Sequence, residues 1–171
     1  MSSETPASAS IPSLSTLVPF LTVNLTASND GDVELDDITF KRVGTGPTGD
    51  IGGAYLFSGD ERLTNKKTIN SSDHTITFNG VGFTIPAGMT KSVTLKINSG
   101  GSGDTGNHAF EILSAAAVSA SGATVSGAFP IMGNTMSYAA VDAATVSFTA
   151  SNNTYTRDIG ETDVILGEFD I

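Results

Sequence analysis

The chain has 171 residues, which is enough for one domain with a sizeable core. Eighteen acidic residues against eight basic ones give a formal net charge of −10, so a nucleic-acid backbone would be repelled. Cysteine is absent, which excludes disulfides, cysteine-ligated zinc and thiol catalysis. No apolar run reaches the length of a membrane span. We therefore expect neither a nucleic-acid partner nor a membrane-spanning segment.

Residues 1–16 are rich in serine, alanine, proline and threonine. This composition is typical of extended linkers, because it offers few apolar side chains to a core. The sequence therefore predicts a mobile linker over residues 1–16 and a folded module that begins at residue 17.

The first predicted strand covers residues 17–27 and contains one irregularity. Its apolar residues alternate, skip three positions and then alternate again; they are Val18, Phe20, Val23 and Leu25. Successive side chains of a strand point to opposite faces, so period two marks one face and an extra residue marks a β-bulge. The spacing therefore predicts a bulged first strand.

The next predicted strand carries a second irregularity. Val33 and Leu35 alternate in one phase, whereas Ile38 and Phe40 alternate in the opposite phase. The switch falls at residues 36–37, which predicts a second bulge or a bend.

Further short strands are separated by turns rich in glycine, proline, asparagine and aspartate. The cleanest covers residues 92–97, where Val93, Leu95 and Ile97 share one face. Residues 108–118 are compatible with a strand or a short helix. The other expected strands cover residues 54–57, 75–78, 81–85, 123–126, 136–140 and 144–150. Many short strands without a sustained 3.6-residue period predict an all-β sandwich or barrel.

Three segments resemble those of a known kind of module. They are Leu56-Phe-Ser-Gly-Asp-Glu-Arg-Leu-Thr64, Phe83-Thr-Ile-Pro-Ala-Gly-Met-Thr-Lys-Ser-Val-Thr-Leu95 and Phe129-Pro-Ile-Met-Gly-Asn-Thr-Met136. They resemble segments of the immunoglobulin-like β-sandwich modules that recur in tandem in large bacterial surface and S-layer-type proteins. The resemblance implies an immunoglobulin-like antiparallel β-sandwich, an extracellular location at the cell surface and no catalytic motif.

The end of the chain repeats the spacing of the first strand. Its apolar residues alternate, skip three and alternate again; they are Val164, Leu166, Phe169 and Ile171. Gly167 falls inside the skip, where a bulge can use its backbone freedom. We interpret residues 17–150 as one module and residues 151–171 as a linker with a strand that resembles the start of a following module.

A strand without a sheet of its own presents an unpaired edge that invites pairing. The C-terminal strand of one molecule could take the place of residues 18–25 in the next molecule, since the two share their spacing. Such a contact is head-to-tail and need not close, so it would build filaments. The expected partners are therefore other copies of the chain or neighbouring modules of the same protein.

Calcium is the one ligand for which the sequence offers a candidate site. Four carboxylates crowd one short segment; they are Asp30, Asp32, Asp36 and Asp37. Calcium takes six to eight oxygen ligands, but the spacing is not that of an EF-hand. Aspartates in turns also hydrogen-bond the neighbouring backbone, so a purely local role is the alternative. We expect no other cofactor.

Enzyme chemistry finds no support in the sequence. The two histidines, His74 and His108, stand beside turn residues without a nucleophile motif, and we expect both at the surface. The most direct prediction is a structural cell-surface module that acts as a spacer, fibre or surface-layer unit. The alternative is an adhesin or carbohydrate-binding module, although the chain has no tryptophan and only three tyrosines for sugars to stack on.

Overall fold

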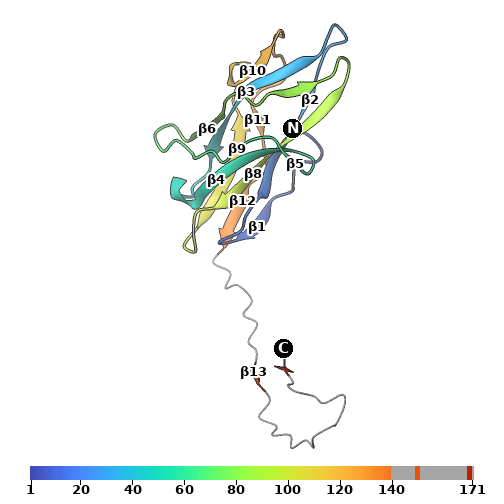
Figure 1. The fold of residues 1–171 in the computed structure, drawn as a ribbon. Coiled ribbons are helices and arrows are strands. Elements are labelled where there is room, and N and C mark those ends of the chain that lie inside the picture. The colour runs from blue at the N-terminus through green and yellow to red at the C-terminus, as the bar shows by residue number, and fades with distance from the viewer. Residues whose placement is uncertain (140–148, 151–168, 171) are drawn as a thin grey trace, which may run out of the picture. The chain divides into compact units, whose positions relative to one another are not determined.

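The computed structural model describes residues 1–139, 149–150 and 169–170 (Figure 1). The chain divides into two compact units, Met1–Val141 and Asp142–Ile171. Within the described residues the elements are strands and two short 3-10 turns, Thr48–Asp50 and Ala115–Ala117. The first unit is an all-β sandwich of two packed sheets, as the sequence predicts.

The smaller sheet has four antiparallel strands, and Figure 1 shows them side by side. In spatial order they are β2 (Val18–Thr26), β8 (Thr90–Ser99), β4 (Ile51–Ser58) and β5 (Glu61–Arg62). β2 is therefore an edge strand, paired with β8 along its whole length. In β8 the predicted alternation holds, because Val93, Leu95 and Ile97 are all fully buried.

The larger sheet has eight strands. Its main path is β1 (Ala9–Pro12), β12 (Met136–Ala139), β9 (Gly106–Ile112), β3 (Val33–Val43) and β10 (Val118–Ser121). Three more strands join this path: β6 (Thr75–Phe78) and β7 (Phe83–Ile85) pair with β3, and β11 (Ile131–Met132) pairs with β9. The pairing of β1 with β12 is parallel, and the other pairings are antiparallel.

Aromatic side chains join the two sheets. Phe20 of β2 and Phe110 of β9 lie edge to face with ring centroids 5.4 Å apart, and both are fully buried. Phe40 and Phe78 form a second such pair, 6.1 Å apart, within the larger sheet. Edge-to-face pairs add about 0.5–1.5 kcal/mol each to the burial of their area.

Both predicted bulges are present. In β2 the register with β8 shifts between Pro19 and Leu21, so Phe20 is the extra residue. Because of this insertion, Phe20 and Leu21 are both fully buried, although they are adjacent. Pro19 is tolerated because β2 is an edge strand, where a missing backbone donor costs least.

The bulge of β3 falls where the apolar phase switches. Ser119 of β10 is paired with Asp37 and Ala120 with Leu35, so Asp36 is the extra residue. Leu35 and Ile38 are three positions apart and both buried. The bulge thus keeps the apolar residues of a long strand on the core side along its whole length.

The N-terminal segment corrects the expectation of a mobile linker over residues 1–16. Ala9–Pro12 forms β1, and Ile11 is only 4% exposed. Ser2 and Thr5 are also buried and bond to the backbone of Thr22. The composition hides this role, since one apolar side chain, the hydroxyl of Thr5 and the backbone N–H of Ser2 are enough to attach the segment.

Two of the expected strands differ from the structure. Residues 123–126 form no strand, because β10 ends at Ser121 and Gly122 follows with a φ of +74°. The expected strand over residues 144–150 is described only at Thr149–Ala150, which is β13 and pairs with β14 (Phe169–Asp170). β13 and β14 belong to the second compact unit, so the first unit ends at Val141 rather than at the predicted residue 150.

Candidate functional site

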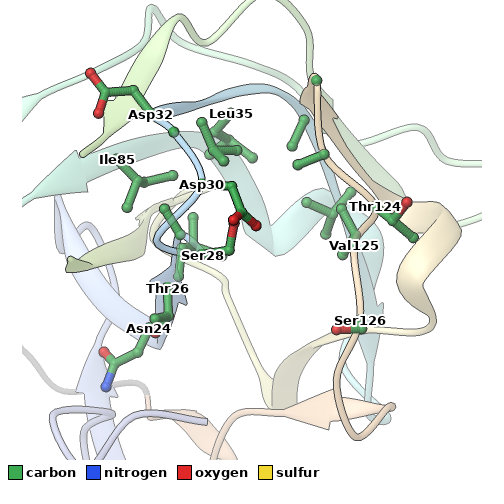
Figure 2. A pocket seen from close by; sticks show the side chains of 18 residues that line it. Asn24, Thr26, Ser28, Asp30, Asp32, Leu35, Ile85, Thr124, Val125 and Ser126 are labelled. Atoms are coloured by element: carbon green, nitrogen blue, oxygen red, sulfur yellow. The ribbon is translucent and has the colours of Figure 1, made fainter. Parts of the chain in front are cut away.

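A hollow of about 560 Å³ lies between the end of β2, the start of β3 and the segment that follows β10 (Figure 2). Its floor is apolar and comes from four strands: Leu25 of β2, Leu35 of β3, Ile85 of β7 and Val118 of β10. Leu35 and Ile85 are buried, whereas Leu25 and Val118 are half-buried. The hollow therefore opens directly onto the edge of the core.

The wall of the hollow is polar and lacks basic groups. Hydroxyls line it from both sides; they belong to Thr26, Ser28, Thr124 and Ser126. Among the described residues that line it there is no lysine, arginine, histidine or aromatic residue. Its volume falls within the range of small-ligand sites, about 300–1,000 Å³.

Two of the four predicted calcium ligands stand at this hollow. Asp30 turns its carboxylate toward the hollow, whereas Asp32 points away from it (Figure 2). The Oδ1 atom of Asp32 accepts a hydrogen bond from the backbone N–H of Ala87, at 2.9 Å. Asp32 therefore holds the turn between β7 and β8 against the turn between β2 and β3.

The other two predicted ligands point to opposite sides of β3. The Oδ2 atom of Asp36 accepts a hydrogen bond from the Ser121 hydroxyl of β10 at 2.7 Å, and Oδ1 of Asp37 accepts one from the backbone N–H of Gly80 at 3.0 Å. Within the described residues, no group of three or more histidine or acidic side chains is placed to hold a metal. The structure does not bring the four carboxylates together. Three of them bond to segments that are distant in the sequence, so they fill neither the calcium role nor the local role of bonding the neighbouring backbone.

A second polar region lies at the far end of β3, around His108. This side chain is fully buried, which corrects the expectation of a surface histidine. Its Nε2 lies 3.1 Å from Oδ2 of Asp50, and its Nδ1 lies 3.3 Å from Nη1 of Arg42. Arginine has only donors, so Nδ1 must accept and Nε2 must carry the proton that it donates to Asp50. The two partners thereby fix the tautomer of the neutral ring.

The same residues connect two loops. Arg42 Nη1 donates to the carbonyl of Gly46 at 2.7 Å, and Asp50 accepts from the backbone N–H of Thr105 at 3.1 Å. Burial lowers the pKa of Arg42, and the charge of Asp50 opposes this effect. The cluster of Arg42, Asp50 and His108 therefore fastens the loop after β3 to the loop before β9.

Tyr138 of β12 covers the cluster. Its ring lies edge to face on His108, with centroids 5.3 Å apart. Its hydroxyl is buried and has no hydrogen-bond partner among residues 1–139. Burial raises the pKa of Tyr138, and the nearby charges of Asp104 and Asp50 raise it further. Arg42, Asp50, His108 and Tyr138 together hold the two loops in place, and we call these four residues the lock.

The predicted strand-exchange residues fall into two groups. In β2, Phe20 and Val23 are buried, and Val18 and Leu25 are half-buried. Phe169 belongs to β14 and is paired with Ala150, so this part of the predicted donor strand has a partner in its own unit. The other three predicted donor residues, Val164, Leu166 and Ile171, lie outside the described residues.

Sequence reasoning missed the lock and the lining of the hollow. One signal for the lock was available: His108 shares its phase with Phe110 and Ile112, which predicts an inward direction. No comparable sequence pattern indicated that Asp50 belongs to the lock or that residues 122–126 line the hollow.

Comparisons with protein-family models, with curated proteins and with solved structures find no match for this chain. Among the residues that the structure describes, no helix is long and apolar enough to cross a membrane.

Proposed function

We propose that the chain is a structural module of a tandem cell-surface protein, serving as a spacer, fibre or surface-layer unit outside the cell. One observation carries the proposal: the bulged spacing of β2 recurs at residues 164–171, in the second unit of the chain. A repeated strand signature beyond a complete sandwich is what the start of a following module would look like.

The details of β2 strengthen this comparison. Two of the three buried apolar residues of β2 have large apolar counterparts, Leu166 for Phe20 and Phe169 for Val23, whereas the third, Leu21, corresponds to Gly167. Asn24 is exposed and on the outer face, and its counterpart Asp170 is polar. The match therefore covers the positions on either side of the skip, but not the skip itself, where buried Leu21 and Thr22 correspond to Gly167 and Glu168.

A chimeric β2 tests whether the second copy is a strand of this kind. Five substitutions give β2 the apolar and polar order of the second copy while keeping Leu21 and Thr22; they are Pro19→Ile, Phe20→Leu, Val23→Phe, Asn24→Asp and Leu25→Ile. We expect cooperative unfolding with a loss of about 2–4 kcal/mol, because the volumes of buried residues change.

The matched control has the same composition but carries Val23→Asp and Asn24→Phe. It buries a carboxylate at position 23 without a partner and should not fold. Urea unfolding followed by circular dichroism distinguishes the two variants. If the chimera is as unfolded as the control, residues 164–171 are not a β2-like strand.

The alternative function, an adhesin or carbohydrate-binding module, would use the hollow as its sugar-binding site. Sugars bind by stacking on aromatic rings, and the hollow has none. Tyr55, on the smaller sheet, is already covered by the guanidinium of Arg62, 5.8 Å from the ring centroid. The lining thus favours the structural role, and a glycan array with a specific hit would reverse that preference.

Assembly by strand exchange would require β2 to leave its sheet. Burying four large apolar side chains yields about 6–12 kcal/mol, at 1.5–3 each, but displacing Phe20, Val23 and their neighbours loses a similar amount. The displaced strand would also lose its pairing with β8 and its bonds to Ser2 and Thr5. We therefore propose covalently linked neighbouring modules as the main partners, and exchange between copies as the second arrangement.

Light scattering of the full chain and of a chain ending at Val141 separates these arrangements. Tandem linkage predicts monomers in both samples at low concentration. Polymers in the full chain alone would establish strand exchange through residues 164–171.

A further inference from the structure

The outer edge of β2 is open over its second half. The N–H and C=O of Thr22 point away from β8, since they bond to the Thr5 hydroxyl and to the N–H of Ser2 at 2.9–3.1 Å. Backbone directions alternate along an antiparallel strand, so Asn24 and Thr26 present the same edge. No described backbone group outside the sheet bonds to them.

The N-terminal segment shows that this edge binds an added piece of chain. Ser2 and Thr5 are buried against it and satisfy the backbone of Thr22. Ser2 and Thr5 cover this edge of β2 only as far as Thr22, two residues before Asn24. The edge beyond is a row of donors and acceptors of the kind that pairs with an extended peptide.

The hollow lies directly beside this open edge. Both Asn24 and Thr26 line it, and its floor is the apolar set Leu25, Leu35, Ile85 and Val118 (Figure 2). A strand added to β2 would point alternate side chains into the hollow and the others to solvent. The site therefore offers backbone pairing and an apolar pocket together.

The charge around the hollow determines which extended peptides it would favour. Asp30 turns its carboxylate toward the hollow, and the lining contains no basic residue. The chain as a whole has a net charge of −10. Its own C-terminal segment, residues 161–171, contains four acidic residues and no basic one, so a second copy would bring like charges to Asp30.

We propose that the groove formed by the open edge of β2 and the hollow binds an extended segment of another protein by strand addition, with a lysine or arginine side chain placed at Asp30. This binding leaves β2 in its sheet, unlike strand exchange. It goes beyond the proposed structural role and adds a partner of defined chemistry to the module.

The test is an NMR titration of the full 171-residue chain with the capped peptide Thr-Val-Thr-Lys-Thr-Val-Thr, whose valines and lysine share one face. We expect saturable shifts at the amides of Asn24, Thr26 and residues 122–126, at peptide concentrations of about 1 mM or below. The same peptide with glutamate in place of lysine should bind several-fold more weakly.

Peptides N-methylated at alternate residues test the backbone pairing. Methyl groups in one phase remove the donors that face β2, and methyl groups in the other phase leave them intact. Strand addition predicts that one phase abolishes binding and that the other phase preserves most of it. Equal binding in both phases would overturn strand addition.

Two protein variants test the groove itself. Asp30→Asn should weaken the lysine peptide about two- to fivefold and remove the preference over glutamate. Asp60→Asn, which makes the same charge change at an exposed turn, should leave binding unchanged. Ala120→Phe should fill the hollow and abolish saturable binding while the thermal midpoint stays close to that of the parent chain.

Several results would overturn the proposal: no saturable shift at several millimolar peptide, equal binding of the lysine and glutamate peptides, or unchanged binding to the Ala120→Phe variant. Tighter binding of a peptide with the sequence of residues 161–171 would assign the groove to a second copy of the chain instead. The chimeric β2 experiment measures folding and not peptide binding, so failure here leaves the tandem-module proposal intact.

Discussion

The lock around His108 and the hollow beside β2 lie at opposite ends of β3 and use polar residues in opposite ways. In the lock, Arg42, His108 and Asp50 are buried and bonded to one another, and glycine allows the backbone to approach the ring. In the hollow, Asp30 is exposed and the nearby edge of β2 is open. Polar groups stabilise one end of the sandwich and leave a free surface at the other.

The largest effect is expected from Asp50→Ala in the lock. The substitution leaves His108 Nε2 only the longer contact to the Thr105 carbonyl, at 3.3 Å, and removes the opposite charge that acts on Arg42. Breaking a buried set of this kind costs about 3–5 kcal/mol. Urea unfolding measures the change. Asp60→Ala, at an exposed turn, is the control and should change the free energy of unfolding by less than about 0.5 kcal/mol.

The second largest loss of stability is expected from Gly46→Ala. A methyl group at Gly46 would stand 2.1 Å from the His108 ring, so the ring or the loop must move, at about 1–3 kcal/mol. Gly31 at the hollow has no atom within 4 Å of such a methyl group, and Gly31→Ala should leave stability nearly unchanged. Equal losses in both variants would mean that the lock end is not packed more tightly than the hollow end.

Tyr138→Phe should stabilise the protein by about 1 kcal/mol at neutral pH, because it removes a buried hydroxyl that has no partner. The pKa of Tyr138 is raised in the folded state. Its neutral form therefore contributes stability below the ordinary tyrosine pKa of about 10, and this contribution is lost as the pH rises through the higher folded value.

Thermal melting at pH 8 and pH 11 checks this sign. The parent chain should lose more stability between the two values than the phenylalanine variant loses. An equal loss in both chains would show that Tyr138 titrates as freely in the folded protein as in the unfolded one.

The smallest effect is expected from calcium at the hollow end. Asp32, Asp36 and Asp37 each bond to a different element, so they are not arranged around one ion. Melting in excess calcium and in chelator should differ by less than about 5 °C, on the order of 1 kcal/mol for a domain of this size. A larger difference would restore these carboxylates as calcium ligands.

The features that followed from the sequence are those with a local signature. The bulges of β2 and β3 were predictable because an extra residue changes the phase of an alternating apolar pattern, which is visible at Phe20–Val23 and at Leu35–Ile38. The clean alternation of β8 was predictable for the same reason.

The features that did not follow depend on contacts between distant segments. β1 has one buried apolar residue, Ile11, and is a strand because β12 lies beside it. Asp50 is a lock residue because the loop at residues 99–106 folds over it, and the hollow exists because the chain turns away at Gly122. Neither arrangement leaves a periodic pattern in the sequence.

The tandem-module account is tested most directly by a chain in which residues 1–171 are followed at once by residues 26–141 of the same sequence. Residues 164–171 then stand where β2 stands in the appended module. The account predicts an unfolding enthalpy, measured by calorimetry, close to twice that of the 171-residue chain, because enthalpy scales with the number of folded residues. Exchanging Phe169 and Asp170 in that chain should remove the added enthalpy. An enthalpy equal to that of the single chain, with the appended residues open to protease, would contradict the account.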